Sequence, residues 1–259
     1  MSDVIRMSRD GAVAAITIDR PAEGNVLTTD MLRALTATIR AAAASDAKVI
    51  ALRSTGADFC RGRDGKGGPT NPTALVMRDQ VLQPILDVYD ALNGAPQPVV
   101  CAVQGAAYGF GCATAAACDV TIAADVAKFR LPEMSHDLPP TLAISALMLK
   151  VPRKALAYMV YAMPELDAAT ALQLGIVSAV VPVRRARCQG RRRAQDHDRA
   201  LARGAHRRER LSAQRPDDGA ARRRGLWRGA PLRCAHVGGP QVIAALRCCP
   251  LLKPVTCSQ

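Results

Sequence analysis

The sequence predicts an α/β fold over residues 1–182 and a region of different character over residues 183–259. Short strands alternate with amphipathic helices along the first region, a pattern typical of parallel sheets with right-handed crossovers. The charge divides the chain at the same point. Residues 1–182 hold 16 Lys and Arg against 17 Asp and Glu, whereas residues 183–259 hold 19 against 5, and 18 of those 19 are Arg. We therefore expect residues 1–182 to form the folded core.

The elements of this core are predicted from their apolar spacing and from the turn residues that bound them. Strands are predicted at residues 11–19, 49–53, 98–103, 120–123, 128–130 and 176–181. Helices are predicted at residues 31–44, 73–93, 112–117, 142–150, 153–161 and 168–174. Thr29 or Asp30 caps the first helix, Pro84 kinks or splits the second, and Gly175 ends the last. Residues 105–111 are predicted as a Gly-rich turn.

The composition limits the compartment and the class of protein. Cys60, Cys101, Cys112 and Cys118 stand in apolar or Gly-rich surroundings, where a free thiol packs as a small hydrophobic group. The first residues contain no apolar run typical of a secretion signal, so we expect a reducing, cytoplasmic setting. The longest uncharged stretch, residues 91–118, is interrupted by Pro, Gln and Gly, so we expect no membrane span. Cys112 and Cys118 lack ligand partners at metal-binding spacing, so no metal site is expected.

The Arg-rich region, residues 183–259, allows two interpretations. A basic arm that binds nucleic acid is one, but such arms mix Lys with Arg, and this region has the single Lys253. The nearly neutral core has no charge excess to attract a polyanion, so we do not expect a nucleic-acid partner. The other interpretation is a frameshift near residue 183 of a GC-rich gene, which translation of the coding DNA in the other two frames tests. We then expect the region to be disordered and without an evolved role.

Two Gly-rich loops, residues 60–65 and 105–111, are candidate binding elements. Glycine allows the backbone to approach a ligand closely, and a helix start carries unpaired amides and partial positive charge. Two such amides directed at one thioester oxygen would stabilise an enolate. Neither loop has the spacing of a phosphate-binding P-loop or of a dinucleotide-binding fingerprint.

Taken together and in order, these segments resemble a known family. The strings are ITIDRPAEGNVLTTDML, DFCRGRD, AVQGAAYGFGCATAAACDVTIAADVAKFRLPE and ALQLGIVSAVVP. They are similar to the enoyl-CoA hydratase/isomerase (crotonase) superfamily over about residues 10–182. The resemblance implies a crotonase-like spiral of ββα repeats that binds acyl-CoA and needs no cofactor beyond the coenzyme A of its substrate. It also implies trimers or hexamers, and a C-terminal helical region that the aberrant Arg-rich region replaces here.

The resemblance also implies a site in this chain. The backbone amides of Arg63 and Phe110 fall on the two donors of the family's oxyanion hole. The residues around them fall on the substrate-binding loops, namely Gly62, Asp64, Lys66, Gly109 and Gly111. The side chains of Lys66 and Arg63 are candidates for contact with the phosphates of coenzyme A.

The acid–base residues implied by the resemblance decide between reactions. The family's hydratases use two glutamates: one position holds Ala113 here, and the other holds Glu133. A single carboxylate suits an enoyl-CoA isomerase, which moves a proton between C2 and C4. The alternative is an enoyl-CoA hydratase in which His136, beside Asp137, is an auxiliary acid or base. A third interpretation is an inactive subunit that binds CoA thioesters.

Overall fold

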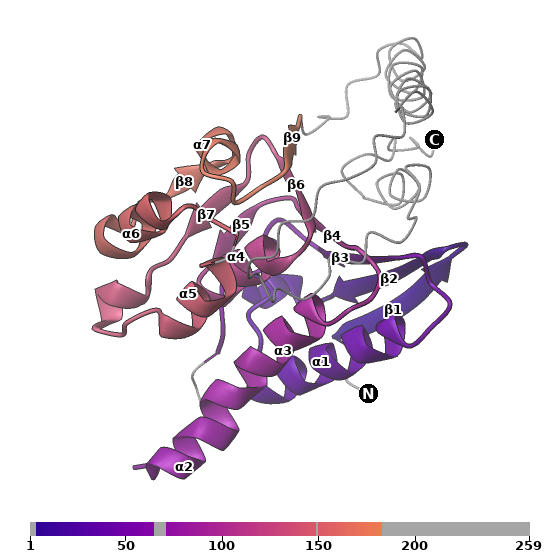
Figure 1. Cartoon of the computed structure of the whole chain (residues 1–259), viewed down its shortest axis with the longest axis horizontal. Coiled ribbons are helices and arrows are strands. Elements are labelled where there is room, and N and C mark those ends of the chain that lie inside the picture. The colour runs from indigo at the N-terminus through magenta and orange to yellow at the C-terminus, as the bar shows by residue number, and fades with distance from the viewer. Residues whose placement is uncertain (1–3, 65–70, 149, 183–259) are drawn as a thin grey trace, which may run out of the picture. The chain divides into compact units, whose positions relative to one another are not determined.

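Strands that follow one another in the chain are distributed over two sheets. The computed structural model describes residues 4–64, 71–148 and 150–182, which belong to one compact unit. The larger sheet has the order β1-β2-β3-β4-β6-β9 and the smaller one the order β5-β7-β8 (Figure 1). The strands are β1 (Ile5–Asp10), β2 (Val13–Ile18), β3 (Val49–Ser54), β4 (Val99–Val103), β5 (Ala106–Tyr108), β6 (Val120–Ala124), β7 (Lys128–Arg130), β8 (Leu166–Asp167) and β9 (Ala179–Val181). The α-helices are α1 (Thr29–Ala43), α2 (Ala74–Met77), α3 (Gln83–Asn93), α4 (Phe110–Ala117), α5 (Thr141–Leu147), α6 (Arg153–Ala162) and α7 (Ala168–Gln173).

The pairing within the sheets confirms the predicted α/β class. β1 and β2 form an antiparallel hairpin, and β2, β3, β4, β6 and β9 pair in parallel. The hairpin turns at Gly11, whose φ of 55° suits a residue without a side chain. In the smaller sheet, β5 and β7 are parallel and β7 and β8 antiparallel. β4 and β6 lie in the larger sheet, and β5 and β7 lie in the smaller one. The chain therefore passes from the larger to the smaller sheet between β4 and β5, and again between β6 and β7.

The main core lies between the larger sheet and the helices α1 and α3, which run side by side (Figure 1). Apolar side chains of alternate strand positions meet the buried stripes of these helices. Members of this core with at most 3% exposure include Ile16, Ile50, Leu52, Cys101, Leu35, Ile39, Val88 and Leu92. The intervening strand positions point to the opposite face, where Val13, Val49, Val100 and Ile122 form a second, smaller cluster.

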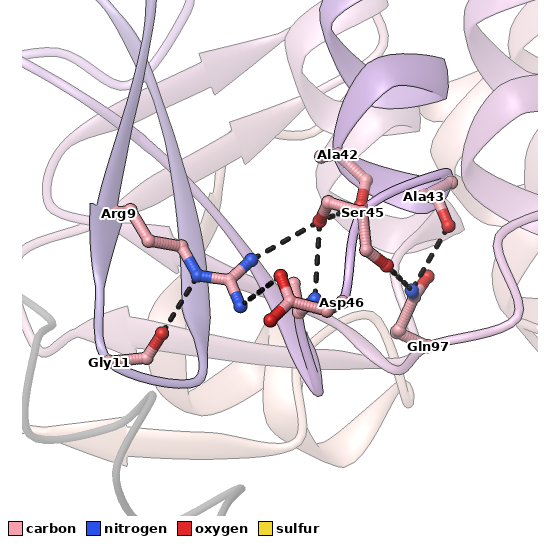
Figure 2. Close-up of polar contacts among 8 residues, drawn as sticks. Arg9, Gly11, Ala42, Ala43, Ser45, Asp46 and Gln97 are labelled. Carbon is pink, nitrogen blue, oxygen red and sulfur yellow. Dashed lines mark hydrogen bonds and ion pairs between the residues drawn. The ribbon is translucent and has the colours of Figure 1, made fainter.

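Polar contacts fasten the hairpin to the end of α1 (Figure 2). The Arg9 guanidinium donates to the Gly11 carbonyl (2.7 Å), the Ser45 hydroxyl (3.2 Å) and Asp46 Oδ1 (2.8 Å). The Gln97 side-chain amide donates to the carbonyl oxygens of Ala43 (3.0 Å) and Ser45 (3.4 Å). The Ala43 carbonyl, at the C-terminal end of α1, and the Ser45 carbonyl just beyond it are thus satisfied by a side chain from a distant segment.

Three expectations about the elements are corrected by the structure. The first helix is capped by Thr28, whose hydroxyl accepts from the Met31 amide (3.4 Å), not by Thr29 or Asp30. The segment 105–111 is not only a turn, because it contains β5, three residues long and paired with β7. β1 was not predicted, because this edge strand exposes five of its six residues and buries only Ile5.

The predicted effect of Pro84 is confirmed in a specific form. The helix over residues 73–93 is divided into α2, a π-helical stretch Arg78–Leu82, and α3. Pro84 has no amide, and its ring would collide with the carbonyl four residues earlier, so a wider turn before it relieves the conflict.

Some predictions lie outside the described residues. These are the roles of Lys66 and the disorder of residues 183–259. Within the described ranges, no helix has the length and apolar character needed to cross a bilayer. The same ranges contain no group of three or more His, Cys, Asp or Glu side chains placed to hold a metal ion.

Candidate active site

The first Gly-rich loop lies between β5 and the segment 24–27. On the β5 side, the Cys60 amide donates to the Ala106 carbonyl (3.0 Å), and the Tyr108 amide donates to the Cys60 carbonyl (2.9 Å). This pair of bonds forms a short parallel bridge between the two loops. The two Gly-rich loops, separated in sequence by residues 66–104, therefore lie side by side.

The backbone amide of Arg63 points away from Leu27, the residue that is hydrogen-bonded to Gly62 and Asp64 on either side of it. Leu27 donates to the Gly62 carbonyl (3.2 Å) and accepts from the Asp64 amide (2.8 Å), which occupies the backbone groups on either side of Arg63. In a parallel bridge the residue between such bonds turns its own amide to the opposite side. No acceptor for the Arg63 amide lies among the described residues. Burial lowers the pKa of the half-buried Arg63 guanidinium, and the charge of Asp64 opposes this effect.

The Phe110 amide opens helix α4 at the second loop. Gly109 precedes it with φ 51° and ψ −117°, a backbone conformation that side chains disfavour. The Gly109 amide donates to the Arg130 carbonyl (2.9 Å), which fixes the start of α4 against the end of β7. The Phe110 amide is the first of the helix, and the described part of the chain offers it no acceptor.

Gly111 brings α4 into direct contact with the first loop. A β-carbon placed on Gly111 would lie 2.1 Å from the Cys60 carbonyl oxygen and 2.9 Å from the Cys60 β-carbon. Only glycine permits this separation. The first turn of α4 therefore packs directly on the loop that carries Arg63.

Glu133 lies beside the start of α4. It begins a short 3₁₀ helix, Glu133–His136, three residues after Arg130. A β-carbon on Gly109 would lie 3.0 Å from Glu133 Oε1, and Glu133 Oε2 is buried without a hydrogen-bond partner in the described residues. Burial raises the pKa of the half-buried Glu133 carboxyl; its own backbone amide and the charge of His136 act in the opposite direction. A carboxylate of this kind is a suitable proton acceptor.

The structure also shows the surroundings of Ala113 and of the auxiliary candidate His136 with its neighbour Asp137. Ala113 is completely buried in α4 and carries no functional group. The His136 side chain is exposed, although its charge affects Glu133. Asp137 ends the 3₁₀ turn in the left-handed region (φ 56°), and its amide donates to the Met134 carbonyl (3.2 Å).

One residue near the site was not predicted. Tyr89 of α3 stacks on Phe110, with ring centroids 5.9 Å apart and an interplanar angle of 20°. It is 3% exposed, and burial raises the pKa of its phenol, with further contributions from Glu133 and Cys112. In the sequence, Tyr89 falls within the helix predicted at residues 73–93 and was given no role in the site. An aromatic residue is rare in this chain, and that rarity was the one available signal.

A comparison with protein families settles the relationship. The family model described as enoyl-CoA hydratase/isomerase matches residues 8–204. This chain belongs to the enoyl-CoA hydratase/isomerase family. The expected resemblance is thus confirmed, although we expected it to end near residue 182 and the match ends at residue 204.

Individual members of the enoyl-CoA hydratase/isomerase family show the same relationship. The 2,3-dehydroadipyl-CoA hydratase of Escherichia coli is 31% identical over 184 residues, which cover 70% of each protein. Enoyl-CoA hydratase domain-containing protein 3, mitochondrial, of rat is 31% identical over 175 residues. That match covers 67% of this chain and 58% of the rat protein, so the chain spans less than two thirds of that relative.

Solved structures of the family agree with the observed fold. The crystal structure of enoyl-CoA hydratase from Mycobacterium smegmatis superimposes with a TM-score of 0.66 at 29% identity, covering 70% of this chain and 71% of that one. Human enoyl coenzyme A hydratase domain-containing protein 3 gives a TM-score of 0.65 at 28% identity, covering 78% and 76%. The crotonase-like α/β fold predicted for the core is thereby supported.

Proposed function

We propose that this family member is an enoyl-CoA isomerase that converts a 3-enoyl-CoA into a 2-enoyl-CoA. The observation that carries the proposal is the half-buried carboxylate of Glu133 against Gly109, the residue that precedes Phe110 at the start of α4. Ala113, at the position of the second glutamate of the family's hydratases, is buried and has no side-chain acid or base. A reaction that needs one proton acceptor fits this site better than a reaction that must also orient and deprotonate water.

The proposed reaction uses the same carboxylate twice. Glu133 removes a proton from C2 of the 3-enoyl thioester, and the electron pair moves onto the thioester oxygen. The amides of Arg63 and Phe110 stabilise the resulting dienolate. The protonated Glu133 then returns the proton to C4, so that the double bond ends between C2 and C3 and the carboxylate is restored.

The remaining loop residues are proposed to bind the substrate. Gly62 and Gly109 allow the backbone on both sides of the thioester to expose its amides, and Gly111 holds the two loops together. Asp64 and Lys66 are proposed to contact the coenzyme A portion. Coenzyme A is part of the substrate, and no separate cofactor is proposed.

The second candidate is an enoyl-CoA hydratase, favoured by the names of the relatives. The E. coli relative is a 2,3-dehydroadipyl-CoA hydratase. In this alternative Glu133 and His136 together position the water that adds to a 2-enoyl-CoA. The exposed position of His136 supports this alternative less well than the isomerase.

Two substrates and one substitution test these proposals. The protein should convert 3-enoyl-CoA into 2-enoyl-CoA, and Glu133→Gln should reduce kcat by at least about a hundredfold, because proton transfer contributes about 10²–10⁴-fold. Binding of a saturated acyl-CoA should change little. Formation of 3-hydroxyacyl-CoA from 2-enoyl-CoA would support the hydratase instead. Binding of saturated acyl-CoA without turnover of either substrate would support an inactive thioester-binding subunit.

Self-association and a cytoplasmic location complete the proposal. Large apolar side chains are exposed between the 3₁₀ turn and α6, and they would be covered in a trimer or hexamer. They include Leu138 (61%), Met148 (59%), Tyr158 (52%) and Tyr161 (79%). The name of the rat relative places that protein in mitochondria. The cytoplasmic location proposed for this chain rests on the free, buried cysteines of its described residues, which suit a reducing compartment.

A further inference from the structure

Three side chains converge on one backbone carbonyl, that of Asp58. It accepts from Asn25 Nδ2 (2.8 Å), from Gln104 Nε2 (2.8 Å) and from the Ser54 hydroxyl (3.2 Å). Asp58 lies in the turn that leads from β3 into the first Gly-rich loop. A carbonyl oxygen with this many donors is held firmly in position.

Asn25 joins this turn to the segment that supports Arg63. It is completely buried, and its φ of 57° lies in the left-handed region. Its Nδ2 donates to Thr55 O and Asp58 O (2.8 Å each), while its Oδ1 accepts from the Arg20 amide (2.8 Å). All the hydrogen-bonding capacity of the Asn25 side-chain nitrogen is therefore directed at the turn.

Gln104 joins the same turn to the second loop. It stands between β4 and Gly105, and its Nε2 also lies near Ser54 Oγ (2.9 Å) and the carbonyl of Gly56 (3.3 Å). With the Ser54 carbonyl (3.4 Å), all its hydrogen-bond partners are acceptors, so an NH₂ group suits this position. A β-carbon on Gly105 would lie 1.9 Å from the Ala57 carbonyl oxygen, so the two backbones touch at this point.

We propose that Gln104 and Asn25 are positioning residues of the oxyanion hole, because their amides fix the first loop relative to the second through the Asp58 carbonyl. Gln104 belongs to the chain that leads to Phe110, and its acceptors belong to the chain that leads to Arg63. The separation of the two amides is thereby set by this side chain. The inference rests on the proposed function of these amides and adds residues that do not touch the substrate.

The test compares Gln104→Met with Gln97→Met in the full chain. Gln97 is a matched control because its side-chain amide also donates to two backbone carbonyls, at the far end of α1 (Figure 2). Infrared difference spectra of bound butanoyl-CoA, labelled with carbon-13 at the thioester carbonyl, report the strength of hydrogen bonds to that oxygen. Kinetics with 3-enoyl-CoA give kcat and KM, and thermal melts confirm that each variant is folded.

The expected result is a split between the two variants. Gln104→Met should reduce the red shift of the carbonyl band and lower kcat by about ten- to a hundredfold with a small change in KM, because displaced donors lose transition-state stabilisation. Gln97→Met should lower the melting temperature similarly but leave both readouts unchanged. Equal red shifts in Gln104→Met and the unmodified protein would overturn the inference. Absence of a red shift in the unmodified protein would instead overturn the proposed function.

A milder variant keeps the inference testable if Gln104→Met does not fold. Ser54→Ala removes one partner of Gln104 and one donor to Asp58 O while leaving both amides in place. It should weaken the red shift in the same direction by a smaller amount. An unchanged red shift in folded Ser54→Ala would count against the positioning role.

Discussion

At the scale of single residues, the carboxyl group of Glu133 is held in an environment that leaves one of its oxygens able to accept a proton. Its Oε2 is buried and has no hydrogen-bond partner among residues 4–64, 71–148 and 150–182, although a buried acceptor normally finds a donor. Such an atom destabilises the fold unless something else occupies the site. A bound substrate whose C2 proton meets this oxygen would supply the missing contact. The unsatisfied atom therefore marks the position of the reacting carbon in our proposal.

The raised pKa of Glu133 predicts the pH dependence of turnover. The base must be ionised, so kcat/KM should fall as the pH decreases through the pKa of the free enzyme. Because burial raises that pKa above the ordinary value of 4.5, the loss should begin at a higher pH than for a solvated carboxyl. Steady-state rates across the acidic range check this, with binding of a saturated acyl-CoA over the same range as the control. An acid limb at or below 4.5 would contradict the assignment.

Gly109 and Gly11 form a matched pair for testing the backbone beside Glu133. Both have positive φ, 51° and 55°, but a β-carbon on Gly11 meets no atom within 4 Å, whereas one on Gly109 approaches Glu133 Oε1 at 3.0 Å. Gly11→Ala should cost about 1–2 kcal/mol of stability and leave turnover unchanged. Gly109→Ala should cost about 1–3 kcal/mol and also lower kcat at least about tenfold. Denaturant unfolding and steady-state kinetics provide the measurements; equal kcat values would contradict the proposed contact.

At the scale of elements, helix α4 determines the geometry of the site. Its first turn presents the Phe110 amide, its N-terminus is bound to the end of β7, and Gly111 rests on the Cys60 carbonyl. All eight residues of α4 are buried, and all but Phe110 are small or medium-sized, which allows the helix to enter the space between the loops. The helix is thus placed by close packing rather than by an amphipathic stripe.

Gly111→Ala is predicted to force α4 away from the first loop. The added carbon would lie 2.1 Å from a backbone oxygen, so the backbone must shift, and the expected loss of stability is about 3 kcal/mol with loss of turnover. Ala116→Gly is the control, because it weakens the same helix by about 1 kcal/mol without pressing on the loop. Chemical denaturation and activity assays compare the two. A Gly111→Ala protein with unchanged kcat would show that the loop tolerates the displacement.

At the scale of the whole molecule, the core excludes solvent from every cysteine in the described residues. Cys60, Cys101, Cys112 and Cys118 are buried, and burial raises the pKa of both Cys60 and Cys112 to about 12. These two thiols lie against the loops of the site, so their reaction requires opening of the folded core.

Thiol labelling is therefore predicted to follow unfolding. In the native protein at pH 8, alkylation of these four cysteines should be slow, and it should become fast at the denaturant concentration that unfolds the chain. Peptide mapping by mass spectrometry distinguishes them from the five cysteines of residues 183–259. Fast native labelling of Cys60 or Cys112 would indicate that the site opens without unfolding.

Local sequence patterns determined much of the fold. The alternation of apolar strands and helices specified the α/β class and most elements, because burial of one face imposes a fixed spacing on the chain. The two Gly-rich loops were predicted from their composition, whereas the site roles of Gly62, Gly109, Gly111 and Glu133 came only from the family resemblance. Patterns failed where apolar spacing was absent, as in the edge strand β1 and the three-residue strand β5.

Only the tertiary structure decided how the parts of the site meet. The contact of Gly109 with Glu133, the stacking of Tyr89 on Phe110 and the convergence of Asn25 and Gln104 on Asp58 join residues far apart in sequence. The spacing of polar residues along a chain says nothing about which distant carbonyl an amide will reach. The packing of β4 and β5 against the neighbouring loops determines which carbonyl each amide reaches. The two backbones must lie at a distance that lets every buried donor find an acceptor, and few arrangements meet that condition.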